Sequence, residues 1–143
     1  MGTEQQYVIF RMMGQLFGAP IDVVREVNYL TPVTKLPNTP DFVEGVIDLR
    51  GEILPVVDLR KRLGLPVRTA DAESRLMVLN LGERSAALLV DGVDQVVTLN
   101  SEAIIPPDAH VVLPGKEYVL GVARSEESLV VMLDLGRLMD EAI

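Results

Sequence analysis

The chain has 143 residues, a formal net charge of −8 and no cysteine, which excludes disulfides, thiolate metal sites and a cysteine nucleophile. An acidic chain with only 4% aromatic residues is a poor nucleic-acid binder, because phosphate contacts dominate that affinity. Hydrophobic residues make up 48% of the chain and are mostly Val, Leu and Ile, which favours strands.

No apolar run approaches the roughly 18 residues that a membrane span requires. Residues 1–6 are polar and lack the basic-then-apolar order of a signal peptide. We therefore expect a cytoplasmic protein with no direct membrane insertion.

The first half reads as short strands separated by turns. Strands are predicted at 7–12 and 16–21, whereas 23–30 fits a short helix or a strand equally well. After a Pro-rich loop, β-rich runs on either side of Arg50-Gly51 predict a hairpin. Asp58 is placed to cap a helical turn over 59–63.

The second half follows the same plan after a linker at 66–73. Strands are predicted at 76–81, 85–90 and 96–99, and a loop at 101–118. A last hairpin is expected from 118–123 and 129–133, with Asp134 capping a final helix.

These halves are related by an internal repeat. The segment from Gly45-Val46 to Leu63 returns 76 residues later from Gly121-Val122, and the segment 22–27 returns 69 residues later at 91–96. A repeat of this length predicts two copies of one small fold. We expect an all-β chain of two five-stranded barrels, residues 7–65 and 75–142. Each copy is too small to bury much surface alone, so we predict a shared hydrophobic seam.

No residue pattern supports catalysis. His110 is the only histidine and lies in a predicted surface loop, so it cannot form a metal site by itself. Asp58 and Asp134 are equivalent in the repeat and are best explained as helix caps. Phosphate-loop and nucleophile-elbow motifs are absent. We predict no enzyme activity, no catalytic residue, no metal and no cofactor.

Two basic features remain. We expect the cluster Arg60, Lys61, Arg62 and Arg68 to form a solvated helix face. Arg50 lies at a predicted hairpin tip, and its counterpart in the repeat is Glu126. A turn arginine is either solvated or contacts a partner, since arginine is enriched at protein interfaces.

The motifs of the chain resemble the CheW family of chemotaxis coupling proteins. The resemblance covers nearly the whole chain, and its residues follow in the family's order. They are Phe17-Gly18 through Val24-Arg25-Glu26-Val27, Pro40-x-Phe42-x-x-Gly45-Val46-x-x-Leu49-Arg50-Gly51-x-Ile53-x-Pro55-Val56-Val57-Asp58-Leu59-Arg60, Leu79-Asn80-Leu81-Gly82, Val90-Asp91-Gly92-Val93 and Leu133-Asp134-Leu135.

The resemblance implies an adaptor built from two SH3-like barrels around a common seam. Family members connect the cytoplasmic tips of chemoreceptors to the CheW-like regulatory domain of the histidine kinase CheA and support receptor arrays. The receptor tip is a helical hairpin that docks in the groove between the barrels. The implied partners are thus a chemoreceptor tip and a CheA-type kinase domain, with recruitment to membrane-associated arrays.

The resemblance also implies partner-contacting positions in three segments. They are Val24, Glu26, Val27, Gly45, Arg50, Val90 and Val93. For each valine, plain core packing stays an open alternative.

The chain departs from the family pattern at two positions. Asp48 replaces the usual Asn and could partly neutralise Arg50, and Ala19 stands where a bulkier residue is common. We expect no receiver domain after the final helix, so the chain resembles neither CheV nor CheA.

Alternative functions are a coupling protein of a non-flagellar pathway that controls pili, biofilm or gene expression, a small-ligand sensor with its pocket in the seam, and an enzyme. The sequence offers few buried polar candidates for the sensor and no paired nucleophile and base for the enzyme. Residues 1–70 carry eight acids and eight bases, whereas 71–143 carry thirteen acids and five bases. This difference suggests head-to-tail contact between the acidic half and a kinase domain of similar build.

Overall fold

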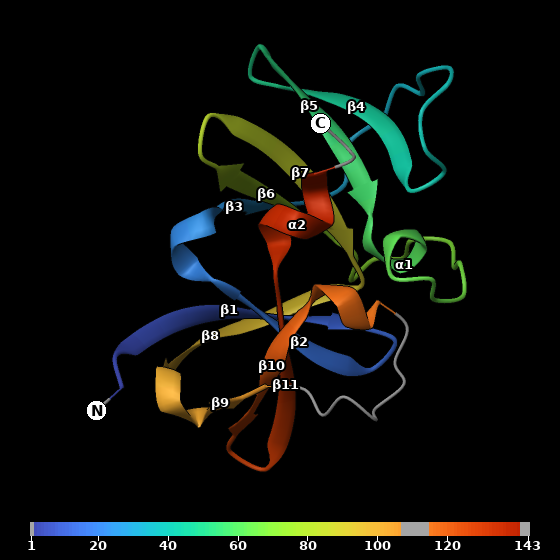
Figure 1. The fold of residues 1–143 in the computed structure, drawn as a ribbon. Coiled ribbons are helices and arrows are strands. Elements are labelled where there is room, and N and C mark those ends of the chain that lie inside the picture. The colour runs from blue at the N-terminus through green and yellow to red at the C-terminus, as the bar shows by residue number, and fades with distance from the viewer. Residues whose placement is uncertain (1, 107–114, 141–143) are drawn as a thin grey trace.

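The structure is a computed structural model that describes residues 2–106 and 115–140. Strands dominate, as the sequence predicts (Figure 1). The strands are β1 Glu4–Met12, β2 Gln15–Pro20, β3 Val24–Asn28, β4 Val43–Leu49, β5 Glu52–Asp58, β6 Arg75–Leu81, β7 Arg84–Val90, β8 Gly92–Asn100, β9 Ile104–Ile105, β10 Val119–Ser125 and β11 Ser128–Leu133. The helices are α1 Leu59–Arg62 and α2 Leu135–Met139, and the 3-10 turns are η1 Ile21–Val23, η2 Ser101–Ala103 and η3 Lys116–Tyr118.

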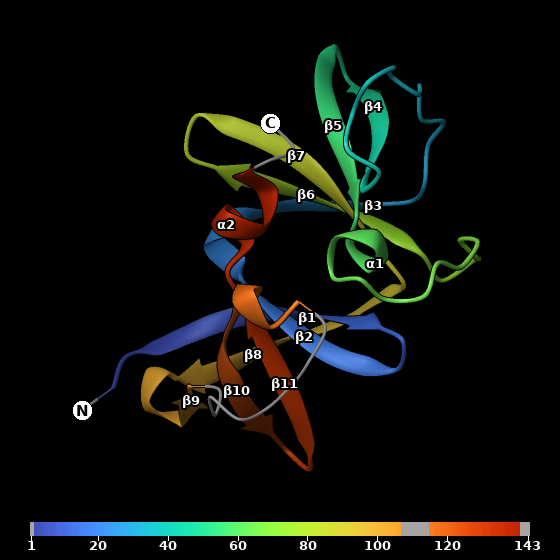
Figure 2. The same ribbon diagram turned by 45° about the vertical axis from the view of Figure 1, so that its right-hand side comes forward.

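Two sheets form the two bodies seen in Figures 1 and 2, which confirms the predicted fold class. One sheet has six strands in the order β8-β1-β2-β11-β10-β9, and the other has five in the order β3-β6-β7-β5-β4. The sixth strand, β9, lies inside the segment predicted as a loop. The ambiguous segment at 23–30 contains the end of η1 followed by β3.

The two halves of the chain exchange strands. The first hairpin, β1–β2, belongs to the same sheet as the last hairpin, β10–β11, and β6–β7 joins β4–β5. Four strand pairs join the two copies: β2 with β11 and β5 with β7 are parallel, and β1 with β8 and β3 with β6 are antiparallel. The predicted subdomains 7–65 and 75–142 therefore do not correspond to the two sheets. That prediction is wrong because each hairpin completes the sheet of the other copy.

The apolar core has three parts, one within each sheet and one between them. The cluster within the five-stranded sheet consists of Ile47, Leu49, Leu54, Val56, Leu76, Val78 and Ala87. The cluster within the six-stranded sheet consists of Tyr7, Ile9, Leu99, Ala123, Val130 and Met132. The central cluster, which joins the sheets, consists of Phe10, Met12, Phe17, Ala19, Val57, Leu59, Leu63, Met77, Leu79, Ala86, Leu88, Val90, Leu133, Leu135, Leu138 and Met139.

The central cluster explains why several strands are apolar without alternation. In β6, Leu76 and Val78 face the core of their own sheet, whereas Met77 and Leu79 face the other sheet. A strand that is buried on both faces reads as a continuous apolar run. The predicted hydrophobic seam is thus confirmed as the largest of the three clusters.

Local signals in the sequence correspond to the observed turns and caps. Asp58 accepts a hydrogen bond from the Arg60 amide, and Asp134 accepts one from the Arg137 amide. Arg50 and its repeat counterpart Glu126 both have positive φ, 51° and 56°, at the tips of equivalent hairpins. Both predicted caps and both hairpins are confirmed.

Glycine is required where another segment crosses each of these hairpins. Gly45 has a φ of 145°, and a Cβ there would lie 2.1 Å from the carbonyl oxygen of Thr34. Thr34 is held at this place by two hydrogen bonds to Val46, of 2.8 and 2.9 Å. In the other sheet, a Cβ on Gly121 would approach the Ile105 carbonyl oxygen to 2.7 Å. The repeat thus keeps both glycines for a steric reason.

Gly45→Ala should destabilise the fold strongly, because the new methyl group collides with backbone that cannot move without breaking the Thr34 bridge. We expect a loss of at least about 2 kcal/mol in the free energy of unfolding, measured by urea denaturation. Gly82→Ala is the matched control, since Gly82 also has positive φ but open space around it. That variant should lose only about 1 kcal/mol. Equal losses in the two variants would contradict the steric explanation.

Candidate functional site

Three of the predicted partner-contacting residues lie on β3, an edge strand of the five-stranded sheet. Val27 is 39% exposed, and Val24 is half-buried against the central cluster. Glu26 faces the opposite side of the strand from Arg25 and Val27, the residues on either side of it. The strand therefore presents both an apolar and a charged group beside the junction of the sheets.

Arg50 reaches this strand from the tip of the β4–β5 hairpin. Its Nη2 donates to Glu26 Oε2 at 2.6 Å, and Asn28 Nδ2 donates to the other Glu26 oxygen at 2.9 Å. Arg25 donates to Glu52 Oε1 at 2.8 Å. We call Arg25, Glu26, Arg50 and Glu52 the β3 charge cluster. The hydrogen bonds from Arg50 and then Asn28 hold the pKa of Glu26 below its ordinary value.

Asp48 does not neutralise Arg50, contrary to the expectation from the sequence. Its Oδ1 accepts a hydrogen bond of 2.7 Å from the Gly51 amide and so closes the hairpin turn. An aspartate that bonds the backbone three residues on is a common turn device. The charge that balances Arg50 comes from Glu26, 24 residues away.

The predicted pair on the second copy divides into one buried and one accessible residue. Val90 is 1% exposed and belongs to the central cluster, so its position does not support a partner contact. Val93 is half-buried on β8, the edge strand of the six-stranded sheet. Gly45 is explained by the close approach of Thr34, and it has no side chain that could contact a partner.

A further exposed valine lies at an equivalent place of the second copy. Val96 lies on β8 and is 48% exposed. It is the counterpart of Val27 under the 69-residue offset, so the repeat itself carried the signal. Each sheet thus ends in an edge strand with an exposed valine at the same place.

The prediction of a solvated basic face around α1 is wrong for Arg60, Lys61 and Arg62, whereas Arg68 is exposed. Arg60 is 6% exposed and is paired with Asp91. Lys61 Nζ lies 2.9 Å from Glu44 Oε1. Each of these cations thus has an anionic partner on another element, which the local sequence does not reveal.

Arg62 is also engaged, between two aromatic rings. Its Cζ lies 4.2 Å from the ring centroid of Phe42 and 4.9 Å from that of Tyr118, and its Nε donates to the Leu138 carbonyl at 2.8 Å. A guanidinium between rings gains cation–π attraction while it excludes water. Arg62 therefore holds α1 against α2 and η3.

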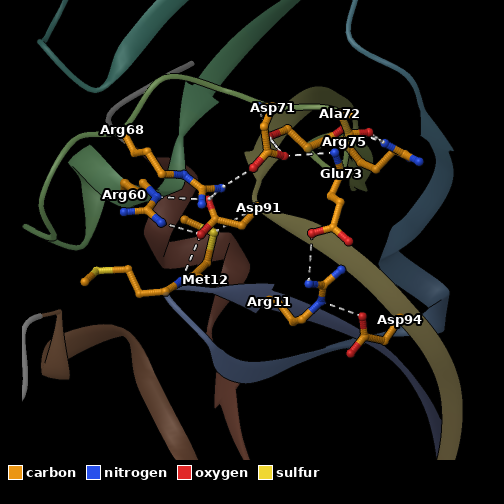
Figure 3. Close-up of polar contacts among 12 residues, drawn as sticks. Arg11, Met12, Arg60, Arg68, Asp71, Ala72, Glu73, Arg75, Asp91 and Asp94 are labelled. Atoms are coloured by element: carbon orange, nitrogen blue, oxygen red, sulfur yellow. Dashed lines mark hydrogen bonds and ion pairs between the residues drawn. The ribbon is translucent and has the colours of Figure 1, made fainter.

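Asp91, between β7 and β8, is the centre of the polar contacts in Figure 3. Arg60 binds it through two nitrogens at 2.9 and 2.5 Å, and Arg68 Nη2 lies 3.5 Å from Oδ1. The Met13 amide donates to Oδ2 at 2.9 Å. Burial opposes the charge of Asp91, but the hydrogen bonds from Arg60 and Met13 prevail and lower its pKa. Beside this group, Arg11 Nε donates to Asp94 at 2.6 Å.

An apolar cavity of about 260 Å³ lies between the β1–β2 turn, the end of α1 and the β10–β11 hairpin. Its lining includes Met12, Phe17, Leu63 and Leu133, and Gln15 is the only polar side chain among the described residues that line it. A small-ligand site normally offers several convergent polar groups. This cavity therefore gives little support to a ligand sensor.

Neither a metal-holding cluster nor a membrane-spanning helix occurs among the described residues. Within ranges 2–106 and 115–140, no group of three or more His, Asp or Glu side chains could hold a metal ion. None of the helices in these ranges has the length and apolarity needed to cross a bilayer. His110 lies outside the described residues.

Comparisons with known proteins agree with the duplicated fold. The model of the CheW-like domain family matches residues 6–142. The chain is 34% identical to "Chemotaxis protein CheW" of Klebsiella aerogenes over 135 residues, covering 94% of this chain and 81% of that one. It is 32% identical to "Protein FrzA" of Myxococcus xanthus, with coverages of 97% and 88%. The solved structure of the scaffolding protein TtCheW from Thermoanaerobacter tengcongensis matches with a TM-score of 0.87 and 33% identity, covering 98% and 90% of the two chains.

Asp58→Asn should leave stability at pH 7 unchanged or slightly raised, because Asn also caps helices well. Burial first, and then the neighbouring charge of Glu44, raise the pKa of Asp58. A raised carboxyl pKa means that the wild type loses stability as pH rises through the folded pKa. The variant has no such loss, so its relative stability should increase from pH 4 to pH 7. Urea denaturation at both pH values measures this difference.

Asp58→Ala is the control, since it removes the cap and should cost about 1 kcal/mol at pH 7. A stability of Asp58→Asn, relative to wild type, that is lower at pH 7 than at pH 4 would contradict a raised pKa of Asp58.

Proposed function

The chain belongs to the CheW-like family, and from this premise we propose that it is a non-enzymatic adaptor that couples chemoreceptor tips to a CheA-type histidine kinase. The match of the family model to residues 6–142 is the observation that carries the proposal. We place the protein in the cytoplasm, recruited to membrane-associated receptor arrays. Its action is binding alone, with no bound cofactor.

The edge strands support the receptor contact. Helix-in-groove recognition uses apolar anchors for affinity and charges for register. Val27 on β3 and Val96 on β8 are exposed apolar anchors on separate sheets. The β3 charge cluster includes two neighbours of Val27 on β3, Arg25 and Glu26, and Arg50 joins it from the β4–β5 hairpin with a side chain that is 65% exposed. A receptor-tip helix would thus meet apolar groups from both sheets and one charged cluster.

The distribution of charge supports a separate contact with the kinase domain. Residues 24–91, which hold the five-stranded sheet, carry ten acids and nine bases, whereas the rest of the chain carries eleven acids and four bases. The stretch that holds the five-stranded sheet is therefore near neutral, whereas the rest of the sequence carries nearly the whole negative charge. Unlike surfaces at the two ends of a molecule suit heterologous, head-to-tail association with a domain of similar build.

The similarity to FrzA favours a second candidate, an adaptor of a non-flagellar chemosensory pathway. Both candidates use the same surfaces and differ in the behaviour that they control. A deletion strain distinguishes them: loss of spreading in soft agar with normal surface motility indicates a flagellar pathway, and the reverse indicates the alternative.

Val27→Asp should weaken binding to a receptor-tip helical hairpin by about tenfold or more, because a charge replaces a desolvated apolar anchor.

Arg50→Ala should weaken binding to at least one of the two partners, since it removes the exposed cation and leaves Glu26 without its main donor. Isothermal titration against the receptor hairpin and, separately, the kinase regulatory domain measures both effects.

Val67→Asp is the matched control for Val27→Asp, because Val67 is 66% exposed in the linker. It should bind both partners like wild type. If the folded wild type bound neither partner from its own pathway, the adaptor role would be wrong.

The double variant Glu126→Gln, Glu127→Gln should weaken binding to the kinase domain and flatten its dependence on salt. Both acids lie at the tip of the β10–β11 hairpin on the acidic sheet. Exposed charges act mainly through long-range attraction, which salt screens. Unchanged affinity at 50 mM and 300 mM salt would remove the charge argument for this contact.

A further inference from the structure

Asp91 receives hydrogen-bond donors from both sheets. Met13, whose amide binds Oδ2, lies at the tip of the β1–β2 hairpin in the six-stranded sheet. Arg60 follows β5 of the five-stranded sheet and binds both carboxylate oxygens. The Asp91 amide in turn donates to the Arg11 carbonyl at 3.1 Å. One side chain thus connects the hairpin of one sheet to the helical turn of the other, at the chain's passage from β7 to β8.

All three guanidinium nitrogens of Arg60 donate hydrogen bonds. Its Nη1 donates to the Pro66 carbonyl at 2.9 Å, so it also fixes the start of the linker. The side chains of Arg60 and Asp91 are only 7% and 15% exposed. A buried pair of this kind is costly to break on one side, because the remaining charge has no solvent to replace its partner.

The repeat lacks this pair at its second junction. Asp22 is the counterpart of Asp91 under the 69-residue offset, but Gly136 stands at the counterpart of Arg60 under the 76-residue offset. One copy of the fold thus forms without this ion pair. The pair is present at one junction only, beside the strand that carries Val93 and Val96.

We propose that the Arg60–Asp91 ion pair is a positioning clamp that fixes the angle between the two sheets, and with it the spacing of the partner-contacting strands β3 and β8. This inference rests on the proposed adaptor function. Asp91 directly precedes β8, so a loosened Asp91 changes where β8 starts relative to α1. The three hydrophobic clusters keep each sheet folded when the clamp is removed.

The angle between the sheets is measurable by electron–electron double resonance between two spin labels. The chain has no cysteine, so labels go only where cysteines are introduced. Ile53→Cys and Leu129→Cys are suitable because these side chains are 61% and 51% exposed, on β5 and β11. They are repeat counterparts and lie in the hairpins of opposite sheets, which Figure 2 shows pointing away from one another.

In this labelled background, Asp91→Asn should broaden or shift the distance distribution, while Asp22→Asn, the same change at the junction without an arginine, should not. Asp91→Asn should also weaken binding of the receptor-tip hairpin by about tenfold, within the usual range of coupling between sites. If Asp91→Asn fails to fold, Arg60→Lys replaces it, since lysine keeps the charge but loses the two-pronged contact.

An unchanged distance distribution in the folded variant would overturn the clamp. A changed distribution with wild-type receptor affinity would overturn its role in positioning the partner surface. If the wild type binds no receptor hairpin, the adaptor function fails, but the distance measurement still decides whether the clamp sets the angle between the sheets.

Discussion

The exchange of hairpins between the two copies is the constraint on which the rest of the structure depends. Each sheet is completed by a parallel pair whose strands come from different copies, β2 with β11 and β5 with β7. Neither copy can therefore close its own barrel, and the strands at the exchange must be apolar on both faces. The central cluster follows from this arrangement, because it is built from the second faces of these strands and of their hairpin partners β1 and β6, together with α1 and α2.

The exchange also places equivalent residues of the two copies next to each other. Phe42 and Tyr118 are counterparts under the 76-residue offset, and both flank the guanidinium of Arg62. Arg62 in turn donates to the carbonyl of Leu138, and Leu138 is the counterpart of Arg62 under the same offset. Contacts between a residue and its counterpart arise only close to the axis that relates the copies. The two helical turns thus meet at this axis, where one arginine serves both copies.

The sequence predicts local structure well and the pairing of distant segments poorly, for physical reasons. The caps at Asp58 and Asp134 and the turn at Arg50-Gly51 depend on a few neighbouring residues, which the sequence states directly. A repeat offset, in contrast, is the same whether each copy closes its own barrel or completes the other's. The burial of Arg60 could not be seen either, because its partner Asp91 lies 31 residues away. Charge patterns alone therefore suggested a solvated face where the structure has a buried pair.

Differences between the copies are informative because the duplicated fold explains the similarities. Positions that serve the fold are alike in the two copies. Examples are Gly45 and Gly121, where another segment crosses the hairpin, and the helix caps Asp58 and Asp134. Where the copies differ in charge, the fold tolerates either residue: the hairpin tips carry Arg50 and Glu126 at the same left-handed conformation. A backbone requirement cannot account for opposite charges at equivalent tips. The two hairpin tips instead present distinct surfaces on a common frame, which fits the proposed adaptor with two different partners.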